Sequence, residues 1–463
     1  MHRHWRFIIA SMWRWSLVLL VLMTACNPVK QAEPFTVITH PDGPLYAGDQ
    51  VSFEIVSADS TDVSNNQVQV SIEGRTLASA GFGPYGVGGR NEAIFWWAWD
   101  THELQPGSYT LTFTLLPEGP EWENIITLHP ADEIPSPGPS ARWTSTTSNC
   151  CTIYYISGTN AARDIETLRQ ITDTQAAGVE DALDADFNGA VTISFLPRTL
   201  GQGGFTTESI YVSYLDQNYA GSTTAQVLHH EMTHLLDAQL GGGYRPVLFV
   251  EGLAVYISGG HFKPEPILPR AAALSGLGWY IPLEKLADDF YPQQHETGYL
   301  EAAALIAYMV QVYGWPAFND FYRHIPDPGS LKPSQAINRA LKERFGISFS
   351  ELEQNFKTYL KSQPVTEDIR TDLRLTVQFY DTVRRYQQGL DPSAYYMTAW
   401  LPDGKSMRER GIVADFLRHP RGFENRLLES MLVGADRNLR AGNYTQVEWS
   451  LRIINVLLSL TDH

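Results

Sequence analysis

The chain has 463 residues, of which 43% are hydrophobic and 18% are charged, and its formal net charge is -17. The length suggests about three folding units, and the composition is typical of a globular protein, which excludes a membrane-embedded bundle and a disordered chain. The acidic balance, without a cluster of basic residues, excludes nucleic acid as an expected partner. Three cysteines are too few for a disulfide framework, so packing must hold the core together.

Residues 1–26 have the pattern of an export signal, in which a basic start is followed by an apolar segment. The end of this segment, residues 22–26, resembles a bacterial lipobox, in which the cysteine is lipidated and becomes the first mature residue. We therefore expect a lipoprotein signal peptide with Cys26 as the lipidation site. The protein would then be extracytoplasmic, at the cell surface or in the periplasm, and anchored to a membrane. An uncleaved signal anchor is the alternative, and it also leaves most of the chain outside.

Residues 27–130 contain short β-type runs that are separated by turn residues. The runs lie at 35–39, 50–56, 67–72, 93–98 and 108–115. Alternating polar and apolar residues at this spacing predict a β-sandwich similar to an immunoglobulin-like domain.

A Pro-rich stretch at residues 131–150 predicts an extended linker and a domain boundary. Its last residue, Cys150, is followed directly by Cys151. Neighbouring cysteines seldom bridge each other, so we expect two free thiols at the start of a strand. A vicinal disulfide or an intermolecular bridge is the alternative.

Residues 151–362 alternate between strand and helix patterns, which predicts an α+β domain. Strands are expected at 152–156, 191–195 and 209–214, and an amphipathic helix at 161–183. The last of these strands leads into a helix that Thr223 or Thr224 caps and that Gly241 ends.

This helix carries an HExxH motif, which is the main chemical signal of the sequence. His230 and His234 lie one turn apart on one face, so both imidazoles can reach a single ion, and Glu231 lies beside them. Glu251, on a predicted returning helix after a Gly-rich reversal, would complete a ligand set with one open position. Asp237 is the competing third ligand, although we expect it to orient a ligand imidazole instead. The alternative to a metal site is that the two histidines are simply a pair of partly buried helix residues.

The motif and the Glu-Gly-x-Ala pattern at Glu251 resemble the gluzincin metallopeptidases, particularly the peptidase MA-like group. The resemblance covers about residues 154–360 and implies a thermolysin-like catalytic fold with one Zn²⁺ ion. It implies that Glu231 is the general base and that Tyr299 stabilises the oxyanion, with His295 as the alternative donor. The zinc ligands that it implies are His230, His234 and Glu251.

The same resemblance implies a substrate-binding strand immediately before the motif helix. Extended substrate backbone is expected to pair with this edge strand, at Ile210, Tyr211, Val212 and Ser213. The sequence departs from the aminopeptidase branch of the family, because Leu248 stands where that branch has Trp and the Gly-x-Met-Glu-Asn motif is missing. A dedicated aminopeptidase is therefore not expected.

Residues 363–463 predict a further helical region in which no chemistry is visible. The expected protein is multi-domain: an N-terminal β-sandwich, an α+β gluzincin catalytic domain and a C-terminal α-helical region. Its expected function is a zinc endopeptidase that hydrolyses extracytoplasmic proteins or peptides with a zinc-activated water. The alternatives are a non-catalytic lipoprotein that binds a partner through its immunoglobulin-like domain, and a hydrolase of the same fold that acts on a non-peptide bond.

Overall fold

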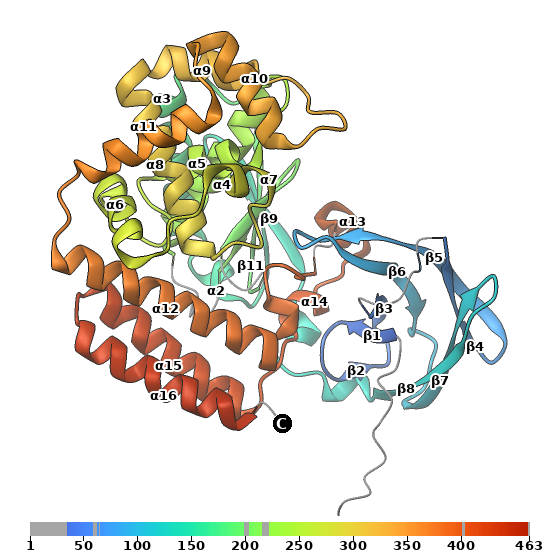
Figure 1. The fold of residues 1–463 in the computed structure, drawn as a ribbon. Helices are drawn as coiled ribbons and strands as arrows, with labels where there is room; N and C mark the ends of the chain where they lie inside the picture. Colours follow the sequence, from blue (N-terminus) through green and yellow to red (C-terminus); the bar gives the residue numbers. More distant parts are fainter. Residues whose placement is uncertain are drawn as a thin grey trace, which may run out of the picture.

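The structure is a computed structural model that describes residues 35–58, 63, 65–198, 203–214, 222–400 and 403–461. A β-rich N-terminal domain, a five-stranded sheet with its helices, and a C-terminal helical region follow one another along the chain (Figure 1). The predicted signal peptide and Cys26 lie outside the described residues. Within those residues, no helix is both long and apolar enough to cross a membrane.

The N-terminal domain is one curled sheet of eight strands in the order β1-β3-β6-β5-β4-β7-β8-β2. Strand β5 joins the two halves of the sheet, because its first part pairs with β4 and its last part with β6. The strands are β1 (Phe35–His40), β2 (Leu45–Tyr46), β3 (Gln50–Ser57), β4 (Gln67–Ile72), β5 (Arg75–Tyr85), β6 (Arg90–Asp100), β7 (Gly107–Leu116) and β8 (Glu121–His129).

Alternating side chains explain why this sheet curls around one core. In β7, Leu111, Phe113 and Leu115 are buried while the threonines between them are not, which is the period of a strand with one face covered. Phe113 packs edge to face on Phe53 of β3, with ring centroids 5.8 Å apart. The prediction of a β-rich domain is therefore confirmed, whereas β5 and β8 were not predicted as strands.

The predicted linker contains structure of its own. Residues 131–150 include the short 3-10 helices η1 (Ala131–Glu133) and η2 (Gly138–Ser140) and the strand β9 (Trp143–Thr147). The prediction of two free thiols is wrong, because Cys150 and Cys151 form a disulfide with an S–S distance of 2.01 Å.

The second sheet has the order β12-β13-β11-β10-β9. Its members β10, β11 and β13 are parallel, and both edge strands, β9 and β12, run antiparallel to their neighbours. The strands are β10 (Cys151–Ile156), β11 (Val191–Leu196), β12 (Gly204–Thr206) and β13 (Ile210–Ser213).

Helices connect and cover these strands. The buried side chains of α3 recur at helical spacing along one face. They belong to the same hydrophobic core as side chains of the sheet and of α4. The helices up to residue 361 are α2 (Asn160–Arg163), α3 (Ile165–Leu183), α4 (Thr224–Leu240), α5 (Val247–Ser258), α6 (Ile267–Leu277), α7 (Leu283–Asp288), α8 (His295–Tyr313), α9 (Trp315–Arg323), α10 (Pro333–Phe345) and α11 (Phe349–Lys361).

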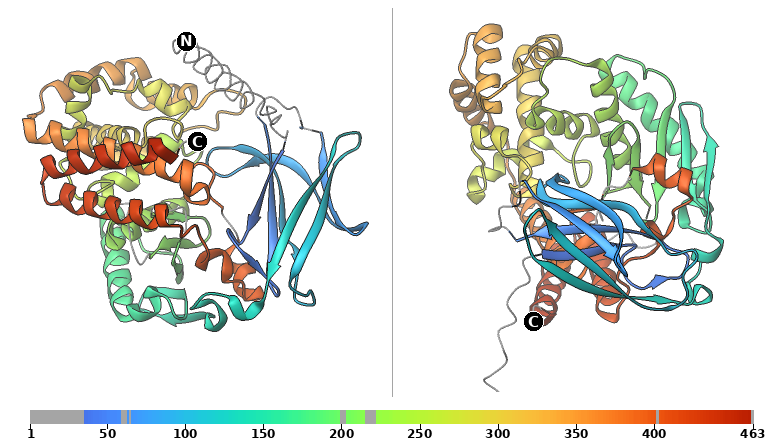
Figure 2. Two further views of the ribbon diagram at one scale, coloured as in Figure 1. Left: turned by 90° about the horizontal axis from the view of Figure 1, so that it is seen from below. Right: turned by 90° about the vertical axis from the view of Figure 1, so that its right-hand side faces the viewer.

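The C-terminal region packs as a layer of long helices, with α12, α15 and α16 side by side in both ribbon figures (Figures 1 and 2). Between them the chain returns to the second sheet, where the indole N–H of Trp143 donates to the Ile412 carbonyl at 2.7 Å. The elements are α12 (Glu367–Leu390), η3 (Pro392–Ala394), α13 (Gly404–Arg410), α14 (Ala414–Leu417), α15 (Phe423–Arg440) and α16 (Tyr444–Thr461). The region therefore contacts parts of the chain far away in sequence.

Candidate metal centre

Helix α4 holds the HExxH motif in the predicted place. The Thr223 side chain accepts a hydrogen bond from the Gln226 backbone N–H at 3.2 Å, and Gly241 follows the last turn with φ +70°. His230 and His234 therefore project from one face of the helix, and their Nε2 atoms lie 2.9 Å apart.

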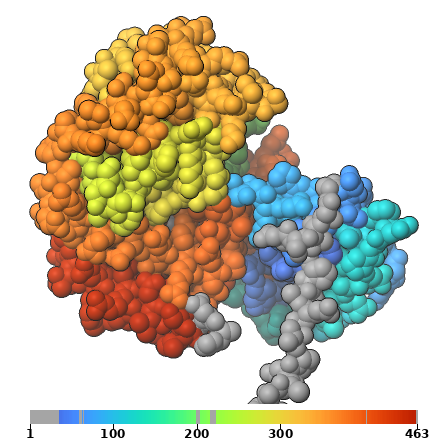
Figure 3. Space-filling view, in the orientation of Figure 1, coloured from blue at the N-terminus to red at the C-terminus, as the bar shows by residue number. Residues whose placement is uncertain are grey.

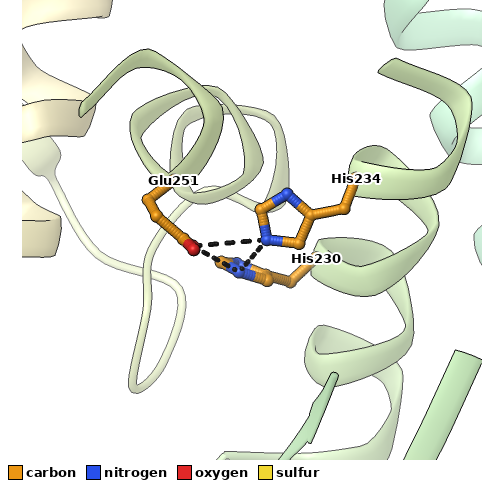
Figure 4. Close-up of side chains that lie close together, drawn as sticks. All are labelled: His230, His234 and Glu251. Carbon is orange, nitrogen blue, oxygen red and sulfur yellow. Dashed lines mark hydrogen bonds and ion pairs between the residues drawn. The ribbon is translucent and has the colours of Figure 1, made fainter. Parts of the chain in front are cut away.

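Helix α5 brings Glu251 to the two imidazoles, as Figure 4 shows. Glu251 Oε2 lies 3.4 Å from Nε2 of His230 and 3.3 Å from Nε2 of His234. The adjoining Gly252 permits this position, because a Cβ there would meet the backbone of Ala302 in α8 at 2.8 Å. Close packing of α5 on α8 therefore explains the Glu-Gly pair.

The geometry of these three residues fits a metal ion. Zn–N and Zn–O bonds in a tetrahedral site place neighbouring ligand atoms about 3.3 Å apart, close to the separations in this cluster. The three residues are half-buried or buried, and each offers one ligand atom to the same point. Imidazole nitrogens and carboxylate oxygens are ligands that proteins use for divalent metal ions.

The electrostatics of the cluster also favour a cation. Burial alone would lower the pKa of His234, but the negative charge of Glu251 raises it to about 9. Burial and the charge of His234 lower the pKa of His230 to about 4. The Glu251 carboxylate thus stabilises positive charge between the two imidazole rings, and a bound metal ion would supply that charge.

Glu231 lies beside this cluster and is 6% exposed. Its Oε2 accepts a hydrogen bond from the Thr206 hydroxyl of β12 at 2.8 Å. Burial raises the pKa of the carboxyl to about 7, which is near the optimum for a general base at neutral pH. Thr206 was not foreseen, because its link to Glu231 depends on how the sheet packs against α4.

The residue that supports Glu251 is Tyr291, which lies between α7 and α8. Its hydroxyl donates to Glu251 Oε1 at 2.8 Å, so the other carboxylate oxygen is turned toward the histidines. Tyr396, from the segment after η3, donates in turn to the Tyr291 carbonyl at 2.5 Å. No spacing in the sequence points to Tyr291 or Tyr396, since the contact of Tyr291 with Glu251 and that of Tyr396 with Tyr291 form only in the folded chain.

The predicted role of Asp237 is wrong. Its carboxylate binds Arg245 at 2.6 Å, Arg323 at 2.7 Å and the Tyr322 hydroxyl at 2.8 Å, instead of a ligand imidazole. Asp237 is only 1% exposed, and these partners compensate for the loss of water around its carboxylate. It joins α4 to α9 and to the loop before α5.

Tyr299 and two further histidines face the metal centre from α8 and from the segment after α5. The ring centroid of Tyr299 lies 6.3 Å from that of His230, and the Tyr299 ring stacks on that of His261 with a centroid distance of 4.3 Å. His295, the alternative donor, lies 4.7 Å from Tyr299. The predicted donors are therefore grouped beside the metal centre.

His261, His295 and Glu296 form a second group with metal-ligand chemistry. Within it, Nδ1 of His261 and Oε1 of Glu296 are 2.5 Å apart, which is a hydrogen-bond length and too short for two ligands of one ion. We read this pair as a hydrogen-bonded dyad.

The predicted substrate strand is not at the edge of its sheet. Ile210, Tyr211 and Val212 are buried, because β13 lies between β11 and β12. The edge strand is β12, which was not predicted because its three residues include a glycine and carry no strand pattern.

One cavity of about 490 Å³ unites these groups. The walls come from β12, α4, α5 and α8, and also from α12 and the segment after η3. The C-terminal side chains on the wall are Tyr380, Arg384 and Tyr396. The C-terminal helical region, in whose sequence no chemistry was visible, therefore forms part of the site.

The chain was also compared with known proteins. It matches no protein-family model and no curated protein by sequence.

Proposed function

We propose that this protein is a zinc-dependent endopeptidase that hydrolyses peptide bonds in extracytoplasmic proteins or peptides. The observation that carries the proposal is the convergence of His230, His234 and Glu251 on one point, with Glu231 beside them in a cavity. Three protein ligands leave a fourth tetrahedral position for water or substrate, as in catalytic rather than structural zinc sites. The same set supports assignment of the catalytic part to the gluzincins, in the peptidase MA-like group.

Bound zinc would supply a Lewis acid that polarises the substrate carbonyl and makes a water molecule acidic enough to attack it. Glu231 accepts the proton of the attacking water and passes it to the leaving amine. Thr206 holds the Glu231 carboxylate in place through its hydrogen bond. Tyr299, which lines the same cavity, is the proposed donor to the oxyanion of the transition state.

The position of β12 supports an extended peptide as substrate. This strand is the last of its sheet, and Gly204, Phe205 and Thr206 all line the cavity. An edge strand offers backbone N–H and C=O groups to a peptide that lies alongside it. The proposed pairing surface therefore moves from β13 to β12.

The proposed setting is outside the cytoplasm. Residues 1–26 would be the lipoprotein signal peptide, with Cys26 as the lipid anchor in the membrane, and the β-rich domain would be immunoglobulin-like. The disulfide between Cys150 and Cys151 supports this setting, because disulfides persist in oxidising compartments.

A peptide-library cleavage assay on the purified protein, with and without a chelator, tests the proposal. We expect about one zinc per chain, hydrolysis that the chelator stops, and a loss of about 100-fold or more in kcat for Glu231→Gln with zinc retained. Glu166→Gln, in an exposed ion pair with Arg169, is the matched control and should change nothing. Absence of bound zinc, or hydrolysis that is unchanged in Glu231→Gln, would refute the proposal. Absence of both zinc and hydrolysis would favour a binding protein.

A further inference from the structure

The N-terminal domain reaches the catalytic cavity through the hairpin of β5 and β6 (Figure 1). The two strands pair as far as Tyr85 and Arg90, so residues 86–89 form the turn between them. Three of these four residues are glycines, and the fourth is Val87. Among the residues that the structure describes in this domain, Val87 alone lines the cavity that holds the metal centre. It is therefore the side chain that the domain can offer to a bound substrate.

The turn is held against the segment after η3 by close backbone contact. The Gly88 N–H donates to the Met397 carbonyl at 2.8 Å, and the two parts touch in the space-filling view (Figure 3). A Cβ on Gly88 would meet this carbonyl oxygen at 2.6 Å, so glycine is required for the approach. Tyr396, the neighbour of Met397, donates to the carbonyl of Tyr291, whose hydroxyl supports Glu251. The turn therefore has a defined position relative to the metal centre, as a group that selects substrates requires.

Aromatic packing fixes the strands of the hairpin near the edge strand β12. The ring centroid of Trp96 in β6 lies 4.4 Å from that of Trp400, and the ring centroid of Tyr85 in β5 lies 6.3 Å from it. Trp400 and Phe205 of β12 line one small cavity together. A peptide that pairs with β12 would therefore pass close to the turn.

The chemistry of Val87 indicates which substrates this part of the cavity favours. The side chain is partly buried and has no hydrogen-bond donor or acceptor, so it binds a substrate by removing apolar surface from water. An apolar substrate side chain in contact with Val87 gains this free energy, whereas a polar one loses hydrogen bonds to water without replacement. Phe205 adds a second apolar side chain to the same cavity.

We infer that Val87 is a specificity-determining residue that contacts an apolar side chain of the peptide substrate in the catalytic cavity. This inference rests on the proposed peptidase function and names its substrate class, which is peptides with an apolar side chain near the scissile bond. It also makes the N-terminal domain part of the substrate site.

Peptides that differ at a single position test the preference. Fluorescent peptides carry Leu or Asn, which have nearly the same shape, at each position in turn. Binding to the zinc-loaded Glu231→Gln protein is measured by fluorescence anisotropy, and hydrolysis by the protein with Glu231 intact is measured in parallel. We expect the Leu form to bind about 10-fold more tightly than the Asn form at one position or more.

Substitutions of Val87 then test the residue. Val87→Thr replaces one methyl group with a hydroxyl and keeps the branched shape, so it should reduce the preference for Leu about threefold, with little change in Tm or in binding of the Asn form. Val87→Asp should remove the preference. The control is Ile125→Thr, because Ile125 is 68% exposed on β8 of the same domain and does not line the cavity. It should keep the full preference.

Photolabelling tests the contact directly. A peptide with a diazirine analogue of Leu at the preferred position is bound to the same protein and irradiated, and the label is located by mass spectrometry. Arg75 and Arg90 flank the hairpin, so trypsin releases residues 76–90 as one fragment that contains Val87. We expect label on this fragment, and we expect an excess of the unlabelled Leu peptide to suppress it.

Three outcomes would overturn the inference: no position that favours Leu, a preference that both substitutions of Val87 leave unchanged, or no label on residues 76–90. Equal weakening of the Leu and Asn forms by Val87→Thr would also overturn it, since this indicates a structural role. Any of these results together with hydrolysis that a chelator stops would leave the peptidase function standing. A preference for Leu that depends on Val87, without any hydrolysis, would leave the subsite standing and refute the peptidase function alone.

Discussion

Removal of one hydroxyl group, by Tyr291→Phe, tests how the metal centre is supported. The hydroxyl donates to Glu251 Oε1 at 2.8 Å, and this bond turns Oε2 toward His230 and His234. Tyr396 contacts Tyr291 through the backbone carbonyl, which the substitution preserves. The change therefore removes a single contact to the ligand set.

The expected magnitude follows from the charge of the acceptor. A hydrogen bond to a charged group contributes about 1.5 to 3 kcal/mol, and each 1.4 kcal/mol is about tenfold in affinity. Groups that orient metal ligands change metal affinity by about 10- to 100-fold when they are removed. We therefore expect Tyr291→Phe to weaken zinc binding by about 10- to 100-fold.

Competition with a chromophoric chelator measures the zinc affinity of each protein. Asp237→Asn is the informative comparison, because it breaks the pairing of Asp237 with Arg245 and Arg323, away from the ligand atoms. It should lower the free energy of unfolding by an amount on the order of 3 kcal/mol and leave zinc affinity nearly unchanged. The reasoning is refuted if Tyr291→Phe binds zinc as tightly as the unmodified protein, or if Asp237→Asn weakens binding as strongly.

Three further predictions concern other parts of the chain. Thr206→Val removes a contact to Glu231, so kcat should fall about tenfold with little change in KM, as steady-state kinetics would show. Burial raises the pKa of Asp415 to about 6, so the folded protein loses stability as the pH rises and this buried carboxyl becomes charged. Thermal unfolding should show that Asp415→Asn is more stable than the unmodified protein at about pH 8, by up to about 3 kcal/mol, and equally stable below about pH 4. A thiol reagent should label Cys150 and Cys151 only after the disulfide is reduced. Reduction itself should barely shift Tm, because a disulfide between adjacent residues closes a very short loop.

The sequence was sufficient where a local period or spacing sets the structure. The helix at Thr224–Leu240 and its cap at Thr223 follow from local hydrogen bonding, and the spacing of His230 and His234 follows from the helix itself. The N-terminal β-rich domain and the helical C-terminal region were also correctly expected. Glu251 was placed correctly because a Gly-rich reversal allows α5 to return toward α4.

Tertiary structure alone decided which groups surround the ligand atoms. Tyr291 reaches Glu251 from 40 residues away, and Tyr396 reaches the Tyr291 carbonyl from 105 residues away, so no local pattern encodes either contact. Asp237 has helical spacing to the motif histidines, yet the loop before α5 and helix α9 each give it an arginine partner instead. Sheet order likewise depends on long-range pairing, so the edge strand at the cavity is β12. The sequence determined which residues can ligate a metal, whereas the fold decided what holds them and what shares their cavity.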